Sequence, residues 1–174
     1  MLQLGYMAEF YTDGSSVPNP GPGGFAVIKD GQPVALGSEN PSTNIRMEAH
    51  ALIAALKLAK DGDTIITDSE FWLNVVTKWA PTWEKNGWTK KSGPIKNLEL
   101  VQELYAAYRA HPGVKLQWTR GHVGTEGNEA ADVWANKARE GATLESATEE
   151  NACKRPSSKP SFRLAPTSSV RSKK

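Results

Sequence analysis

The sequence predicts an α/β domain built on a mixed β-sheet, and two features of the chain carry this prediction. Three short strand-like runs, separated by turns rich in Gly and Pro, fill residues 6–38. From there to residue 139, helix-like and strand-like runs alternate. Antiparallel strands followed by such an alternation are typical of a mixed sheet with helices packed on its faces.

The first three strands are recognisable from their composition and from the turns between them. Aromatic and β-branched residues fill the first run, and Asp13-Gly14 marks its expected end. A loop dense in Pro and Gly follows over residues 15–24, and Asp30-Gly31 is a strong hairpin turn signal. The three expected strands are Tyr6–Thr12, Phe25–Lys29 and Pro33–Ser38.

The second half of the chain supplies two more strands and four helices. Residues 42–44 are N-cap candidates for the first helix, and Pro81 is expected to stop the second helix, with one further turn over Trp83–Asn86. The expected helices are Met47–Lys60, Ser69–Lys78, residues 94–110 and Glu126–Arg139. The expected strands are Thr64–Thr67 and Val114–Thr119.

The composition is that of a globular chain without disulfides. Its 174 residues are 39% hydrophobic and 23% charged, which allows one domain with a core and an additional segment. Cys153 is the only cysteine, so no disulfide forms within the chain, as is typical of a reducing cytoplasm. No apolar run approaches the length of a membrane-spanning helix, and residues 1–6 are too short for a signal peptide. We therefore expect a cytoplasmic protein with no membrane partner.

The C-terminal segment differs from the rest of the chain. From about Ser146 it is rich in Ser, Pro, Lys and Arg and has almost no aliphatic periodicity, which favours disorder. We therefore expect a catalytic domain over residues 1–145 and a weakly basic, disordered tail over residues 146–174. The net charge of the chain is only +2, so a basic surface has to come from local clusters.

Four acidic residues stand at places from which this fold can bring them together. Asp13 and Asp68 end predicted strands, and the carboxyl ends of strands are where ligands collect in α/β sheets. Glu48 lies at the end of the apolar stripe of its helix, so it points toward the sheet. Asp132 follows Asn128 by one helical turn, on a face flanked by small residues.

Each of these acids also has an ordinary explanation. Asp13 can bond the backbone of its own turn, and Asp68 can cap the helix that follows it. Glu48 can reach water beside Arg46, and Asp132 can lie on a solvated helix face. Their joint placement favours a metal site, because several carboxylates without Cys or paired His suit a hard cation, Mg²⁺ or Mn²⁺. Two such ions stabilise the attacking and leaving oxygens of a phosphodiester.

Five motifs, in order and at matching spacing, resemble those of type 1 ribonuclease H. They are Tyr11–Ser15, Asn19–Gly24, Asn44–Glu48, Thr67–Ser69 and the run from Gly121-His122 to Asp132. The resemblance covers residues 6–141 and implies a ribonuclease H-like fold, a mixed five-stranded sheet with helices on both faces. It also implies an endonuclease that hydrolyses the RNA strand of an RNA–DNA hybrid and leaves 3′-hydroxyl and 5′-phosphate ends.

The resemblance implies roles for individual residues. The metal ligands would be Asp13, Glu48, Asp68 and Asp132, holding two Mg²⁺ ions, with Mn²⁺ as an alternative. His122 would be the mobile histidine on the leaving-group side, and an imidazole that titrates near neutral pH suits that role. The residues lying along the hybrid would be Asn19, Asn44 and Asn128.

Residues 78–91 resemble the basic protrusion with which related bacterial enzymes hold the DNA strand. Its candidate substrate contacts are Trp79, Trp83, Lys85, Trp88, Lys90 and Lys91. Lys neutralises phosphate and Trp stacks on bases or sugars, although we expect one or two of these Trp side chains to lie in the core. Glu84 and Asn86 make the segment less basic than in well-known relatives, which predicts a weaker grip on DNA.

Two other functions remain open at this stage. A transposase or resolvase of the same fold would cut DNA, but the chain is short and shows no additional DNA-binding domain. A hybrid-binding module without catalysis would gain nothing from four carboxylates that repel phosphate. We therefore expect a metal-dependent ribonuclease H that acts as a monomer on RNA–DNA hybrids.

Overall fold

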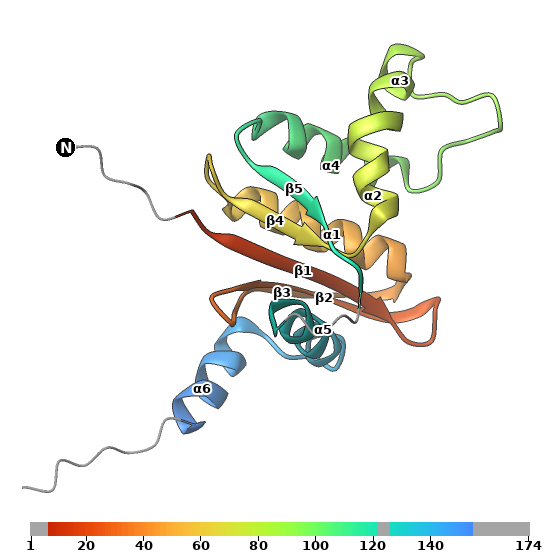
Figure 1. Ribbon diagram of the computed structural model, residues 1–174. Coiled ribbons are helices and arrows are strands. Elements are labelled where there is room, and N and C mark those ends of the chain that lie inside the picture. Colours follow the sequence, from red (N-terminus) through yellow and green to blue (C-terminus); the bar gives the residue numbers. More distant parts are fainter. Residues whose placement is uncertain (1–6, 122–125, 155–174) are drawn as a thin grey trace, which may run out of the picture.

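The protein forms a five-stranded sheet with strand order β3-β2-β1-β4-β5 (Figure 1). The structure is a computed structural model that describes residues 7–121 and 126–154. The strands are β1 (Glu9–Ser16), β2 (Gly21–Lys29), β3 (Gln32–Ser42), β4 (Thr64–Thr67) and β5 (Lys115–Trp118). β1, β2 and β3 pair antiparallel, whereas β4 pairs parallel with both β1 and β5. The predicted mixed five-stranded sheet is confirmed.

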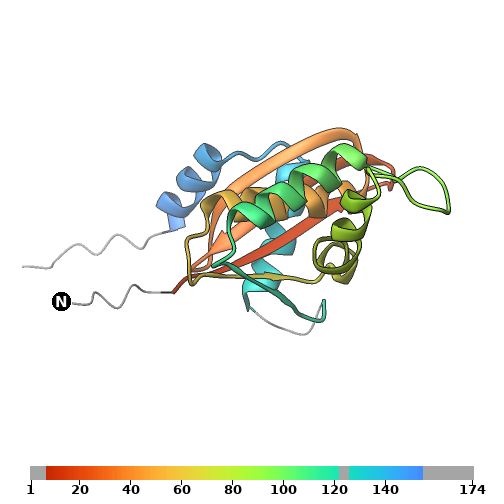
Figure 2. The ribbon, with the colours of Figure 1, turned by 90° about the horizontal axis from the view of Figure 1, so that it is seen from above.

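Helices cover both faces of the sheet, as predicted (Figure 1). They are α1 (Asn44–Leu58), α2 (Glu70–Asn74), the π-helix η1 (Val75–Trp79), α3 (Ala80–Lys85), α4 (Leu98–Ala110), α5 (Glu126–Arg139) and α6 (Leu144–Lys154). A hydrophobic core lies on each face of the sheet, and alternate residues of β2 point into one or the other. Val27 packs with α1 and α4, whereas Ala26 and Ile28 pack with α5. The loop after α3 extends from the end of the molecule opposite to α6 (Figure 2). None of the described helices is both long and apolar enough to cross a bilayer.

Two glycines allow the central helices to approach the sheet closely. A β-carbon built on Gly14 of β1 would overlap the backbone of Met47 and Glu48 in α1. A β-carbon built on Gly24 of β2 would overlap the backbone of α5 at Arg139. Both glycines are buried, so each helix backbone lies directly on the strand at these points.

The strands around the first loop are longer than predicted. β1 continues through Asp13 and Gly14 to Ser16, and β2 already begins at Gly21. The sequence predicts a break there because Gly and Pro usually end strands, but here the glycines provide room for the helices. Asp13 therefore lies within β1, paired with Ala26, and does not end the strand.

The helix that follows Asp68 also differs from its prediction. It does not stop before Pro81, but passes through the π-helical turn η1 and continues as α3, with Pro81 in the first turn of α3. Pro81 has no N–H to donate, and it lies where the hydrogen-bond pattern changes from the π-helical turn η1 to α3. The next helix, expected from residue 94, begins only at Leu98, after Asn97 with a left-handed φ of 54°.

The prediction of a disordered tail from Ser146 is wrong for residues 146–154, which belong to helix α6. Thr143 and Ser146 cap its start reciprocally, since each backbone N–H donates to the hydroxyl of the other residue, at 2.9 and 3.3 Å. Ala147 is 2% exposed and joins the core beneath α5, and Lys137 binds Glu150 at 3.0 Å. The sequence lacks a clear signal because, among residues 144–150, only Ala147 is buried, so no apolar stripe marks the helix. The prediction for residues 155–174 lies outside the described residues.

Because α6 packs on the domain, two truncations are expected to differ in melting temperature. A chain ending at Lys154 is expected to melt at the same temperature as the full chain. A chain ending at Ala142 loses α6, exposes the core around Trp134 and should melt several degrees lower, since about 1 kcal/mol corresponds to roughly 2–4 °C at this size. Differential scanning calorimetry of both shortened chains measures this, and equal melting temperatures would show that α6 contributes nothing to the fold.

Candidate active site

The four carboxylates predicted from the sequence line one shallow cavity of about 220 Å³. Each comes from a different part of the fold: Asp13 from β1, Glu48 from α1, Asp68 from the end of β4 and Asp132 from α5. The other lining residues are Gly14, Ser15, Asn44 and Asn128. The structure therefore brings together all four acids and two of the three predicted asparagines.

Strand pairing places the two aspartates of the sheet next to one another. β1 and β4 run parallel, with Thr12 opposite Thr67, so the following residues, Asp13 and Asp68, are neighbours at the same edge. Asp68 does not cap α2, because Ser69 holds that position and its hydroxyl accepts the Trp72 N–H at 3.4 Å. The ordinary explanation of Asp68 as a helix cap is therefore excluded.

Glu48 is held by a serine rather than by the arginine considered from the sequence. The Ser69 hydroxyl donates to Oε2 of Glu48 at 2.9 Å. Arg46 points elsewhere and binds Glu39 at 2.7 Å and Glu99 at 2.8 Å. Ser69 thus connects the start of α2 to the carboxylate cavity, a role that the sequence analysis missed although the Asp68-Ser69 pair was visible.

Burial and crowding of like charges change the acidity of two of these groups. Burial, followed by the charge of Asp68, raises the pKa of Asp13 from 3.8 to about 8, against a lowering by the Gly14 N–H bond. Burial also raises the pKa of Glu48 from 4.5 to about 7, with the Ser69 bond opposing and the Asp68 charge adding. Such a set of carboxylates favours a bound cation, because a cation offsets both the burial and the repulsion.

The predicted asparagines lie at different depths around the cavity. Asn128 is only 7% exposed and reaches the cavity from α5. The Asn44 side chain accepts the Ser16 N–H at 2.7 Å, and the Asn44 N–H donates to the Asn19 side chain at 3.2 Å. Asn19 is exposed in the loop between β1 and β2, so this chain of bonds places it beside the cavity rim.

The predicted basic protrusion presents a row of aromatic rings. Phe71 contacts Trp79 with ring centroids 5.8 Å apart, and Trp79 contacts Trp83 at 6.2 Å. Phe71 and Trp79 are 43% and 39% exposed, so part of each side chain is accessible to solvent. Lys90 lies 5.9 Å above the Trp83 ring. Phe71 was missed from the sequence, because eight residues of an uninterrupted helix would leave it about 80° away from Trp79, whereas the π-helical turn η1 between them brings the two rings together.

The remaining protrusion residues divide between the surface and the core. Lys85, Lys90 and Lys91 are exposed. Trp88 packs its edge against Tyr105 at 6.1 Å and against the core between the sheet and α4, so it is a packing residue, as expected for one or two of the Trp side chains. Trp83 is half-buried and also contacts this core.

Trp118, the last residue of β5, and Gly121, three residues beyond it, both lie near Asp68. The indole N–H of Trp118 donates to the Asp68 carbonyl at 3.2 Å, a contact that the sequence analysis missed. A β-carbon on Gly121 would lie 3.1 Å from Oδ2 of Asp68. His122 itself is outside the described residues, but its neighbour Gly121 lies directly beside an acid of the cavity.

The sequence and the fold of the chain are both similar to those of known ribonucleases H. The family model described as RNase H matches residues 6–140. The chain is 39% identical over 137 residues to Ribonuclease H of Bordetella avium, covering 75% of this chain and 89% of that protein. It is similar to the crystal structure of a type 1 RNase H with the type 2 active-site motif, with a TM-score of 0.68, 30% identity and coverage of 86% of this chain and 81% of the other.

A foamy viral protease-reverse transcriptase in complex with an RNA/DNA hybrid shares the fold. Its TM-score is 0.64 at 20% identity, over 79% of this chain and 20% of the viral chain. The family model covers most of the present chain, and the motif resemblance drawn over residues 6–141 spans nearly the same range. The chain therefore belongs to the ribonuclease H family.

Proposed function

We propose that this chain is an endonuclease that hydrolyses the RNA strand of RNA–DNA hybrids by a two-metal mechanism, leaving 3′-hydroxyl and 5′-phosphate ends. The observation that carries the proposal is the convergence of four carboxylates from four elements on one cavity. All four come from a single chain, so we also propose that the monomer is the active form.

The donor set of the cavity fits Mg²⁺, with Mn²⁺ as an alternative, because hard cations prefer carboxylate and amide oxygens. Asp13, Glu48, Asp68 and Asp132 would hold the ions, and Ser69 would orient Glu48. Among the described residues, no three such side chains are placed closely enough to enclose an ion by themselves, so water or phosphate oxygens would complete the coordination. When bound, two ions supply the charge that activates water and stabilises the leaving oxygen.

In this proposal, His122 assists proton transfer or release of the cleaved phosphate. Support comes from its sequence position directly after Gly121, which lies beside Asp68. An imidazole titrates near neutral pH and can therefore serve either role. The bound ions would already activate water, so His122 would accelerate the reaction without being indispensable.

The hybrid would lie across the cavity and the aromatic row. Asn19, Asn44 and Asn128 would contact the strand at the cavity. The row formed by Phe71, Trp79 and Trp83, with Lys85, Lys90 and Lys91, would hold the DNA strand, because lysine neutralises phosphate and aromatic rings stack on sugars or bases. Deoxyribose in that strand and 2′-hydroxyl contacts on the other strand would select hybrids over other duplexes.

Removal of the protrusion lysines predicts a change in salt dependence. The variant Lys85→Ala/Lys90→Ala/Lys91→Ala is expected to bind hybrid more weakly, with a log–log salt slope shallower by about one unit for each phosphate that is no longer neutralised. Fluorescence anisotropy across a salt series measures this. Lys115→Ala is the control: it removes an exposed charge at the start of β5, the end of this strand that is farther from Asp68, and it should leave the salt slope unchanged. An unaltered slope in the triple variant would remove these lysines from the interface.

The activity itself is tested with three labelled substrates, namely an RNA–DNA hybrid, duplex RNA and duplex DNA, each with and without Mg²⁺. We expect cleavage of the RNA strand of the hybrid alone, only with the metal, and products carrying 5′-phosphates. Cleavage of duplex DNA would favour a transposase or resolvase activity. Tight hybrid binding without cleavage would favour a binding module.

A further inference from the structure

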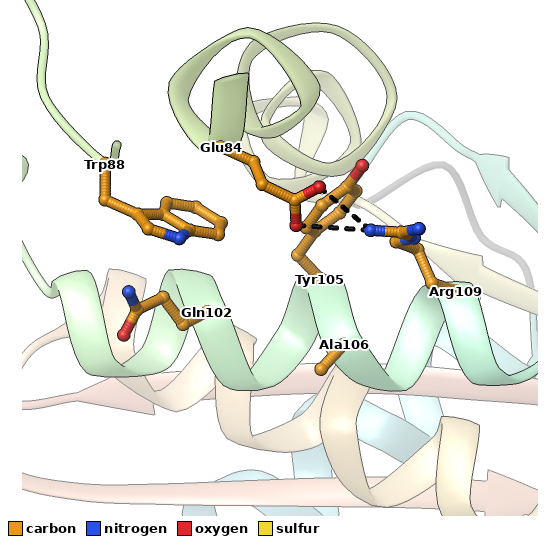
Figure 3. A pocket seen from close by; sticks show the side chains of 6 residues that line it. All are labelled: Glu84, Trp88, Gln102, Tyr105, Ala106 and Arg109. Carbon is orange, nitrogen blue, oxygen red and sulfur yellow. Dashed lines mark hydrogen bonds and ion pairs between the residues drawn. The ribbon is translucent and has the colours of Figure 1, made fainter. Parts of the chain in front are cut away.

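An acidic residue within the basic protrusion is bound to the body of the protein. Glu84 of α3 reaches across to Arg109 of α4, whose Nη1 donates to both carboxylate oxygens at 2.9 and 3.2 Å (Figure 3). The sequence predicts that Glu84 weakens the grip of the protrusion on DNA. In the structure, its charge is instead neutralised by a partner on the neighbouring helix.

The same two segments meet through aromatic side chains. The Arg109 guanidinium lies 5.5 Å above the Tyr105 ring, and Trp88 packs its edge on that ring from the other side at 6.1 Å. Figure 3 shows Glu84 and Trp88 facing Tyr105 and Arg109 across a hollow of about 320 Å³ that is also lined by Gln102 and Ala106. We call Glu84, Trp88, Tyr105 and Arg109 the α3–α4 clamp.

The backbone of the loop adopts a strained conformation to reach the clamp. Trp88 has a left-handed φ of 60°, which is unfavourable for a bulky residue, and it follows Gly87 with a φ of 68°. The Trp88 N–H donates to the Trp83 carbonyl at 2.7 Å, which brings the loop back onto α3. Such strain persists only where surrounding contacts determine the conformation, and here the clamp supplies these contacts.

The clamp is joined directly to the side chains expected to meet nucleic acid. Trp83 precedes Glu84 in α3, and adjacent helical residues point about 100° apart. Trp83 therefore faces the aromatic row while Glu84 faces α4. Lys90 follows Trp88 by two residues and lies above the Trp83 ring. Fixing Glu84 and Trp88 on α4 thus fixes the orientation of Trp83 and Lys90.

We propose that Glu84 and Arg109 are positioning residues for hybrid binding: their ion pair holds the protrusion on α4 so that Trp83 and Lys90 are presented to the substrate. This inference rests on the proposed function. It assigns Glu84 a favourable effect on hybrid binding, the opposite of what its negative charge near phosphate would produce.

The variant Glu84→Gln distinguishes positioning of the protrusion from repulsion of phosphate, because the two effects change the affinity for hybrid in opposite directions. If Glu84 positions the protrusion, the variant raises KM and the hybrid Kd by at most about five-fold, because an exposed ion pair contributes little free energy, and leaves kcat unchanged. If Glu84 only repels phosphate, the variant binds hybrid more tightly. Kd is measured by anisotropy without divalent metal, so binding is read independently of catalysis, and circular dichroism verifies the fold.

Coupling between the partners tests the pair itself. Arg109→Gln should raise Kd to a similar extent, and Glu84→Gln/Arg109→Gln should be no weaker than either single variant, because each change alone already breaks the pair. The reversed pair Glu84→Arg/Arg109→Glu should recover part of the affinity. As a matched control, Glu103→Gln breaks the Lys57–Glu103 pair of 3.7 Å between α1 and α4 and should leave Kd unchanged.

The controls distinguish failure of the inference from failure of the proposed function. A wild-type chain that neither binds nor cleaves the hybrid would overturn the proposed function. A wild-type chain that does both, while Glu84→Gln binds as tightly or more tightly, would overturn the positioning role. Additive losses in the double variant would show that the two residues act separately, which also contradicts the inference.

Discussion

Asp13→Asn is expected to abolish hybrid cleavage while the fold is retained. Asparagine has nearly the shape of aspartate but carries no charge, so the cavity keeps its shape and loses one of the negative charges that would hold the metal ions. Metal ions contribute several kcal/mol to stabilising the transition state, so the rate should fall about 10³-fold or more. Single-turnover cleavage of a labelled hybrid measures the loss. Asp30→Asn, in the exposed turn between β2 and β3, is the matched control and should cleave normally.

Although Asp13→Asn should abolish cleavage, the same substitution is expected to stabilise the folded protein in metal-free buffer. Folding raises the pKa of Asp13 from 3.8 to about 8, so the folded state binds the proton more tightly than the unfolded state. The resulting stabilisation is present below about pH 4 and is lost as the pH rises toward 8. At pH 8, Asp13→Asn should therefore melt several degrees higher than wild type, since one pKa unit corresponds to about 1.4 kcal/mol and thus to roughly 3–5 °C at this size.

Divalent metal should reverse this difference. Mg²⁺ is expected to raise the melting temperature of the wild-type chain at pH 8 and to have much less effect on Asp13→Asn, because ligand binding to the folded state stabilises it. Thermal scans at pH 5 and pH 8, each with Mg²⁺ and with EDTA, compare the melting temperatures of wild type and variant under all four conditions. A variant that cleaves hybrid at the wild-type rate, or that responds to Mg²⁺ equally, would remove Asp13 from the metal site.

Gly14→Ala is expected to damage both stability and activity. The new methyl group would overlap the backbone of Met47 and Glu48, so α1 has to move away from β1. Overpacking of this kind costs about 1–3 kcal/mol, and here it also displaces Glu48 from the carboxylate cavity. Urea denaturation and hybrid cleavage measure the two effects.

A second glycine serves as the control for Gly14. Gly31 has open space around it but a φ of 75°, so Gly31→Ala should cost about 1–2 kcal/mol through backbone strain alone. It lies in the turn after β2, five residues beyond Ala26, the strand partner of Asp13, and should retain activity. Full activity in Gly14→Ala would show that Glu48 does not depend on the close approach of α1 to β1.

The order of strands and helices was predictable because each element carries its own local pattern. The hydrophobic period, the hairpin turn at Asp30-Gly31 and the short run Thr64–Thr67 all record local preferences. The four acids were predictable only in combination, because each has an ordinary local explanation. Pairing of β1 with β4, which the sequence analysis did not specify, then places Asp13 beside Asp68.

What the sequence concealed depends on contacts between distant segments. β1 runs through Gly14 because α1 lies against it, and no local pattern in residues 9–16 records that contact. The partner of Glu48 is Ser69, 21 residues away, whereas the sequence offered the nearby Arg46. The sequence predicts that Glu84 weakens the grip on DNA and does not reveal its partner, because Arg109 is 25 residues further along the chain.

The π-helical turn η1 sets the rotational phase between the carboxylate cavity and the protrusion. α2 is anchored beside the cavity through Ser69, and α3 is anchored on α4 through Glu84. A π turn holds about one residue more than an α turn, so it rotates all later residues by about 100° relative to an uninterrupted helix. Transplanting a protrusion from a relative with a straight helix would therefore direct Trp79 and Trp83 to the wrong side, even with every aromatic residue preserved.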